Sequence, residues 1–176
     1  VEVLRHPNIE VLSYTEVTRV EGSVGDFRVT LTRKPRYINE NICTGCGSCV
    51  RYCPKPSPDV FNQKISIGKA IHIHFSQAIP LVAYIDESCL ELTDGKCDIC
   101  RGVCLNKAID FRQTAETVEV KVATIVLSTG LAPFNPAAVE EYGYGRIPNV
   151  VTSMDYERLL SATGPYQGQI LRASDG

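Results

Sequence analysis

The stretch that decides the fold is ICTGCGSCVRYCP, residues 42–54, which spaces four cysteines as C-x2-C-x2-C-x3-C-P: Cys43, Cys46, Cys49 and Cys53. In proteins with two cubane iron–sulfur clusters, this spacing lets three thiolates wrap one cluster while the fourth reaches to the other. Gly45 and Gly47 lie between ligands, where the backbone must turn sharply and bring N–H groups close to sulfide. Zinc sites usually take two separated cysteine pairs, so the spacing favours a cluster over a zinc ion.

A second cysteine set lies further along the chain, at Cys89, Cys97, Cys100 and Cys104. Its C-x2-C-x3-C part repeats the first motif, but residues 90–96 separate Cys89 from Cys97. We expect these residues to form a looped-out insertion, because Thr93-Asp94-Gly95 is a good turn. The set therefore predicts a second 4Fe-4S cluster, although a zinc knuckle built from the same four cysteines stays open as an alternative.

If both clusters form, the two-cluster pattern exchanges one ligand between the motifs. The first cluster then takes Cys43, Cys46, Cys49 and Cys104, and the second takes Cys53, Cys89, Cys97 and Cys100. A unit this small buries too little apolar surface to be stable alone, so we expect the metals to stabilise it directly.

Composition excludes several classes of protein. The chain has 176 residues, 44% of them hydrophobic, and a formal charge of −2, which gives no nucleic-acid footprint. Two clusters would bring the charge to about −6, which suits a basic or neutral partner surface. No apolar run approaches membrane-spanning length, and no signal peptide is evident. Ligand-like spacing explains all the cysteines without disulfides, and reduced thiols predict a cytoplasmic protein.

Strand patterns flank the cysteines on both sides. Residues 9–14, 16–20 and 27–32 alternate or run β-branched, and residues 117–122 alternate in the same way. We expect residues 117–122 to pair antiparallel with residues 27–32. The cysteine-bearing unit would then be an insertion within a host domain. The predicted division is residues 1–36, a host β-meander; 37–112, the insert; and 113–176, the host's return strands, loop and short helix.

Inside the insert, residues 69–75 alternate with period two and predict one strand that carries His72 and His74 on the same face. Paired imidazoles on one face can hold a metal, but two solvent-side residues opposite Ile71 and Ile73 are the favoured interpretation. Residues 81–86 predict another strand, and residues 108–111 a further one.

Two elements are predicted after the insert. Residues 123–127 form a continuous apolar run, which is typical of a strand buried on both faces, and the run ends in Ser128-Thr129-Gly130. Such a strand end is a common nucleotide site, but a plain turn explains the residues equally well. Further on, Ser153 is expected to cap a helix over residues 154–162, with Leu159 and Leu160 buried and Gly164-Pro165 ending it.

Taken together, these residues resemble the flavin- and cluster-carrying A chain type of heterodisulfide reductases, and the sequence resembles an internal fragment of that larger protein. The matching stretches are HPNIEVLSYTEVTRVEGSVGDFRVTL, the CTGCGSC-x3-CP motif, KAIHIHFSQAIPLVAYID, IVLSTG, EYGYGRIPNVVTS and ERLLSATGP. The resemblance implies an α+β fold, in which a two-cluster ferredoxin-like domain is inserted into a β-rich, partial FAD/NAD(P)-binding flavoprotein domain. It also implies electron transfer to partner proteins of a complex that reduces a heterodisulfide or a related sulfur substrate.

The resemblance places Thr129 and Gly130 near FAD. The G-x-G-x-x-G phosphate loop of dinucleotide folds is absent from these residues, so we expect this piece alone to bind FAD weakly or not at all.

We therefore predict an electron-transfer module of an oxidoreductase, with no catalytic acid or base of its own. Two alternatives stay open. One is an independent soluble carrier with two clusters, and the other is a zinc-stabilised interaction domain.

Overall fold

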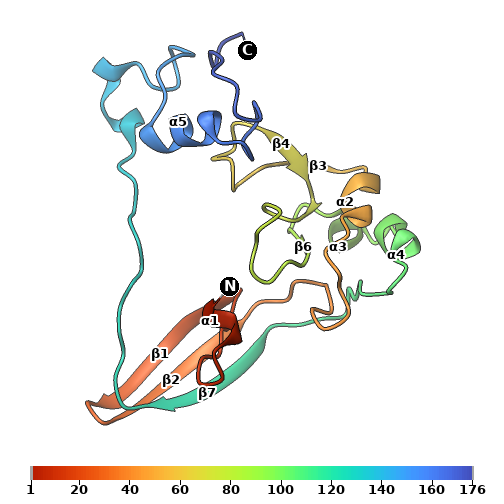
Figure 1. The fold of residues 1–176 in the computed structure, drawn as a ribbon, viewed down its shortest axis with the longest axis vertical. Helices are drawn as coiled ribbons and strands as arrows, with labels where there is room; N and C mark the ends of the chain where they lie inside the picture. The colour runs from red at the N-terminus through yellow and green to blue at the C-terminus, as the bar shows by residue number, and fades with distance from the viewer. Residues whose placement is uncertain (1, 176) are drawn as a thin grey trace.

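A computed structural model describes residues 2–175 of the chain (Figure 1). After a short helix α1 (Glu2–Arg5), a three-stranded antiparallel sheet forms from β1 (Thr15–Ser23), β2 (Asp26–Arg33) and β7 (Glu116–Val122), in the order β1-β2-β7. The predicted pairing across the cysteine-bearing stretch is confirmed, with Val29 opposite Val120 and Leu31 opposite Val118. Val29 and Leu31 are buried, as the alternation of β2 predicts.

The residues between β2 and β7 form a separate small unit of mixed helix and strand (Figure 1). Its helices are α2 (Ser48–Tyr52), α3 (Leu90–Asp94) and α4 (Ile99–Val103), and α2 packs against α4. Its strands form two short antiparallel pairs: β3 (Pro56–Pro58) with β4 (Ile67–Lys69), and β5 (Ile71–His72) with β6 (Tyr84–Ile85).

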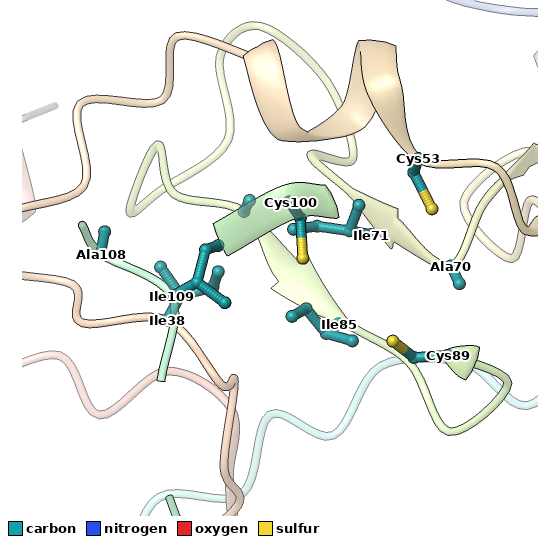
Figure 2. Close-up of a cluster of buried hydrophobic side chains, with 10 residues drawn as sticks. Ile38, Cys53, Ala70, Ile71, Ile85, Cys89, Cys100, Ala108 and Ile109 are labelled. Carbon is teal, nitrogen blue, oxygen red and sulfur yellow. The ribbon is translucent and has the colours of Figure 1, made fainter. Parts of the chain in front are cut away.

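The core of this unit is small and contains cysteine. Ile38, Ile71 and Ile85 are its largest fully buried side chains. Around them are buried Ala70, Ala83, Ala108 and Ile109, together with three cysteines, Cys53, Cys89 and Cys100 (Figure 2). With so few large apolar side chains, burial alone gives little stability, which agrees with the expectation that bound metals contribute to the folding of this unit.

The unit leaves the sheet and returns to it at one place. Ile38 and Ile109 form an antiparallel bridge, in which the Asn39 N–H donates to the Ala108 carbonyl at 2.7 Å. The Asp110 N–H donates to the Tyr37 carbonyl at 3.0 Å. Adjacent start and end points are the geometry that an insertion into a strand connection requires.

Three local predictions for the N-terminal part and the insert were wrong. Residues 9–12 have no regular structure, and Ser13 and Tyr14 form a turn rather than the end of a strand. Residues 69–75 do not form one strand, because the Ala70 N–H donates across to the Lys55 carbonyl and interrupts the β4–β5 run. Residues 90–94 form helix α3 instead of an open loop, and Gly95 ends it in a left-handed conformation.

The apolar run at residues 123–127 is not a buried strand. It belongs to an extended segment that leads from β7 to the C-terminal part (Figure 1), and Val126 and Leu127 are 84% and 81% exposed. Within residues 2–175, no strand pairs with this run, so the prediction of a strand covered on both faces was wrong for the structure described. A β-branched sequence favours extended backbone, but a strand needs partners to bury it.

The C-terminal part contains two short 3-10 helices, η1 (Pro136–Ala138) and η2 (Glu140–Tyr142), followed by helix α5 (Ser153–Leu160). The N-cap of α5 is Thr152 rather than Ser153. Thr152 accepts from the Asp155 N–H while the Asp155 carboxylate accepts from the Thr152 N–H, which is a capping box. Leu159 is buried as predicted, but Leu160 is 36% exposed.

Helix α5 lies against the insert (Figure 1). The Arg158 guanidinium donates to the Asn62 side-chain oxygen at 3.0 Å and lies 4.4 Å from the centre of the Phe61 ring. In the described part of the chain, no helix has the length and hydrophobicity needed to cross a membrane.

Candidate metal centre

The first group of cysteines surrounds a cavity of about 130 Å³. Cys43, Cys46 and Cys49 of the first motif line it, and Cys104 of the second motif completes the set. The other walls are mainly small or apolar residues, among them Ile73, Ala83 and Ala108. Four thiols around one cavity with a dry lining are the donor set that a 4Fe-4S cluster requires, so these residues fit the predicted group.

The second group of cysteines surrounds a much smaller space. Cys53 of the first motif joins Cys89, Cys97 and Cys100 of the second, and the cavity between them is only about 10 Å³, roughly the room for one water. Figure 2 shows Cys53 at the end of α2, Cys100 on α4 and Cys89 before α3, with their sulfur atoms directed into the same interior region. The donors fit a cluster, whereas the space would have to widen to hold one.

The structure therefore brings together the same two sets of four that the crossed arrangement predicts. All eight cysteines are free thiols, so none is paired as a cystine. Among residues 2–175, no three His, Cys, Asp or Glu side chains form a site for a single metal ion. Which cysteine ligates which cluster stays a prediction.

Two glycines shape the first cysteine loop. Gly45 has φ = +65°, and a Cβ atom there would lie 2.6 Å from the Leu81 carbonyl oxygen. Gly47 has φ = +75° and precedes α2 as its N-cap, with open space where a Cβ would be. Both positions use a conformation that L-residues seldom adopt, and this confirms the sequence-based expectation of sharp turns between the cysteines.

Backbone and side-chain groups hold several cysteines in place. The Ala108 N–H donates to the Cys104 sulfur at 3.2 Å. The Asn106 side-chain amide donates to the Ile42 carbonyl at 3.0 Å and so links the second motif to the first loop. The Cys97 N–H donates to the Glu91 carboxylate at 3.0 Å, which ties α3 to the ligand that follows it. Hydrogen bonds to ligand sulfur are among the factors that set the potential of a cluster.

The thiols differ in how easily they ionise. Burial, followed by the neighbouring Cys43 and Cys104, raises the pKa of Cys49 to about 11. Burial, followed by neighbouring Cys89, raises the pKa of Cys100 to about 12. Hydrogen bonds from the backbone and side chain of Ser48 lower the pKa of Cys46, which is exposed at the rim. Metal binding removes these protons, because the ligand is the thiolate.

The structure gives the remaining predicted residues different surroundings. Thr129 and Gly130 are exposed in the extended segment, and Gly130 has φ = +75° with open space around it. His72 is half-buried rather than solvent-side, and both His72 and His74 contact the Tyr84 hydroxyl. Sequence reasoning missed Tyr84 because its contact with the histidines depends on the pairing of β5 with β6.

Known proteins agree with the chemistry of this centre. Residues 34–55 match the family of 4Fe-4S binding domains. The whole chain is 45% identical to a segment of the A-type polypeptide of the H(2):CoB-CoM heterodisulfide,ferredoxin reductase of Methanothermobacter marburgensis. It is also 43% identical over its full length to a segment of the A-type iron-sulfur polypeptide of the CoB--CoM heterodisulfide reductase of Methanocaldococcus jannaschii. The aligned segment is 26% of each relative, so the chain spans about a quarter of their length.

Proposed function

Because the whole chain is homologous to a segment of the A-type polypeptide of heterodisulfide reductases, we propose that it is an electron-transfer module of a protein of this type. In this proposal it binds two 4Fe-4S clusters, one through Cys43, Cys46, Cys49 and Cys104 and one through Cys53, Cys89, Cys97 and Cys100. The observation that carries the proposal is the grouping of the eight thiols into two sets of four, each drawing one cysteine from the other motif. When bound, each cluster supplies one-electron redox chemistry.

The protein residues would hold and tune these groups. The thiolates bind iron, the Ala108 N–H bonds to the Cys104 sulfur, and Ile73 and Ala83 keep the first cavity dry. The packing of α2 on α4 brings the two sets close together, since Cys49 is among the groups that raise the pKa of Cys100. Short separation favours transfer of an electron from one site to the other.

We further propose that the insert belongs to a flavoprotein host domain. The support is the pairing of β2 with β7 across the insert and the single place where the insert leaves and returns. In the full-length protein, FAD would lie near Thr129 and Gly130, and the other subunits of a reductase complex would be the electron partners. Cytoplasmic location also stays a prediction, based on reduced thiols.

An independent carrier with two clusters is the second candidate. The sheet and the extended apolar run at residues 123–127 argue against it, because a free carrier has no use for an additional platform of this kind. A zinc-stabilised interaction domain is the third candidate, and metal analysis separates it: clusters give about eight irons per chain, whereas zinc sites give about one or two zinc ions and no visible colour.

Serine substitutions test the crossed ligand sets. The triple variant C43S/C46S/C49S should lose the first cluster and keep about four irons per chain. Adding C104S should cost no further iron, because Cys104 belongs to the site already lost. Adding C53S instead should remove iron from the remaining site. Iron and acid-labile sulfide per chain are measured after anaerobic reconstitution.

The opposite result has an equally clear meaning. If C53S adds nothing to the triple variant while C104S removes the remaining iron, each motif supplies all four ligands of its own cluster, and the crossed assignment is wrong. Zinc in place of iron in the wild-type chain would refute the electron-transfer proposal as a whole.

A further inference from the structure

A histidine–tyrosine cluster lies on the β5–β6 pair, outside the two cysteine sets. His72 on β5 is directly opposite Tyr84 on β6, and the His72 Nε2 atom contacts the Tyr84 hydroxyl. The same hydroxyl lies 3.2 Å from Nδ1 of His74. One oxygen and two imidazole nitrogens therefore converge from three residues, although only His72 and His74 are close in sequence.

We propose that His72, His74 and Tyr84 form a binding site for a divalent zinc ion, separate from the iron–sulfur centre. Imidazole nitrogen and anionic oxygen are ligands that zinc prefers, and three protein ligands with an open fourth position form a common zinc geometry.

The distances agree with this assignment. In a tetrahedral site with bonds of about 2.0–2.1 Å, neighbouring ligand atoms lie about 3.3 Å apart. The 3.2 Å between the Tyr84 oxygen and His74 Nδ1 matches that separation. Zinc binding would move the Tyr84 oxygen away from His72 Nε2 to a similar distance, in place of their direct contact.

The other nitrogen of His72 is held as in known zinc sites. Its Nδ1 lies 2.9 Å from the Lys69 carbonyl oxygen, which accepts the Nδ1 proton and leaves the Nε2 lone pair directed at Tyr84. Metal-binding histidines almost always donate their second N–H in this way, and the bond fixes both tautomer and ring orientation.

The surroundings allow an ion to enter and the imidazoles to stay neutral. Tyr84 is buried and His72 half-buried, while His74 is exposed and opens the cluster to solvent. Burial lowers the pKa of both histidines, so protons compete little for their nitrogens. Asp59 lies near enough to both rings to favour positive charge there, and Arg36 opposes it at His74.

The experiment uses the full chain with its iron–sulfur clusters assembled and one equivalent of Zn²⁺, followed by dialysis. Zinc and iron per chain are measured by mass spectrometry, and zinc X-ray absorption identifies the neighbouring atoms. We expect about one zinc with nitrogen and oxygen neighbours and unchanged iron. His74→Ala and Tyr84→Phe should each weaken zinc binding at least about tenfold, since loss of even an outer partner costs about 10- to 100-fold.

The matched control is His6→Ala, which removes the remaining histidine of the chain, an exposed residue outside the cluster. It should bind zinc like the wild type. The proposal is overturned if no zinc is retained, if His74→Ala retains as much as His6→Ala, or if the zinc has sulfur neighbours. Sulfur neighbours accompanied by iron loss would mean that zinc had entered a cysteine set. None of these outcomes bears on the iron content before zinc is added, so the two proposals are tested separately.

Discussion

At the scale of single residues, the eight thiols differ in reactivity because their surroundings differ. Ser48 lowers the pKa of exposed Cys46 through hydrogen bonds to its sulfur, whereas burial raises the pKa of Cys100 to about 12. A group with a lowered pKa forms the reactive thiolate at lower pH, and a group with a raised pKa does so only at higher pH. The metal-free chain should therefore show strongly graded alkylation.

We predict that iodoacetamide at a pH of about 8 modifies Cys46 well before Cys100 in the metal-free chain. Raising the pH further should increase the labelling of Cys100 more than that of Cys46, since Cys46 completes its ionisation at lower pH. Peptide mass spectrometry with time measures both rates. Equal rates at the two sites in the native, metal-free chain would show that their surroundings do not differ as described.

The two glycines of the first loop allow a second test at this scale. Gly45→Ala places a Cβ atom 2.6 Å from the Leu81 carbonyl oxygen and also strains a φ of +65°, whereas Gly47→Ala strains φ alone. Left-handed backbone costs an L-residue about 1–2 kcal/mol, so both variants should lose stability. We expect Gly45→Ala to lose more and also to bind less iron, as measured by denaturant unfolding and iron analysis. Equal losses would mean that the contact with Leu81 is relieved without cost.

At the scale of elements, α5 is held against the insert by one side chain. Arg158 is buried, donates to Asn62 and Thr163, and lies over Phe61. Asn62 is itself buried and fixed by the Asp59 carboxylate at 2.8 Å. Removal of the guanidinium would leave the Asn62 oxygen without its partner, and an unsatisfied buried polar group costs about 1–3 kcal/mol.

Arg158→Ala should therefore loosen α5 while leaving the cysteine sets intact. We expect faster amide hydrogen exchange over residues 153–160 and unchanged iron content. Glu157→Ala is the matched control, because Glu157 is the exposed neighbour on the same helix. The docking role of Arg158 would be refuted by equal exchange in the two variants.

At the scale of the whole molecule, stability should be divided between the sheet and the insert. The sheet has a hydrogen-bonded ladder through β1, β2 and β7, which needs no metal. The insert has a core of small residues and cysteines, and its largest fully buried side chains are three isoleucines. Metal binding is coupled to folding where the apolar core is small.

Iron removal with a chelator should therefore raise hydrogen exchange in residues 37–111 far more than in the sheet. The comparison is made on the same sample before and after chelation, with the amides of β2 as the internal reference. A uniform loss of protection along the chain would show that sheet and insert unfold as one cooperative unit.

Local patterns predicted what depends on neighbouring residues. The cysteine spacing indicated 4Fe-4S chemistry, Gly45 and Gly47 indicated sharp turns, and alternation in β2 and β7 indicated their pairing. Local patterns failed where a distant group decided the outcome. The Lys55 carbonyl interrupts the strand predicted over residues 69–75, and the capping box moves the start of α5 to follow Thr152.

The sequence by itself determined the ligand type, the family resemblance and the order of the main strands, because spacing and periodicity are properties of adjacent residues. Only the tertiary structure decided that Tyr84 meets His72 and His74, that Arg158 holds α5 on Asn62, and that residues 123–127 stay exposed. These features depend on groups brought together by folding or on partners that a stretch lacks, and no local pattern records either.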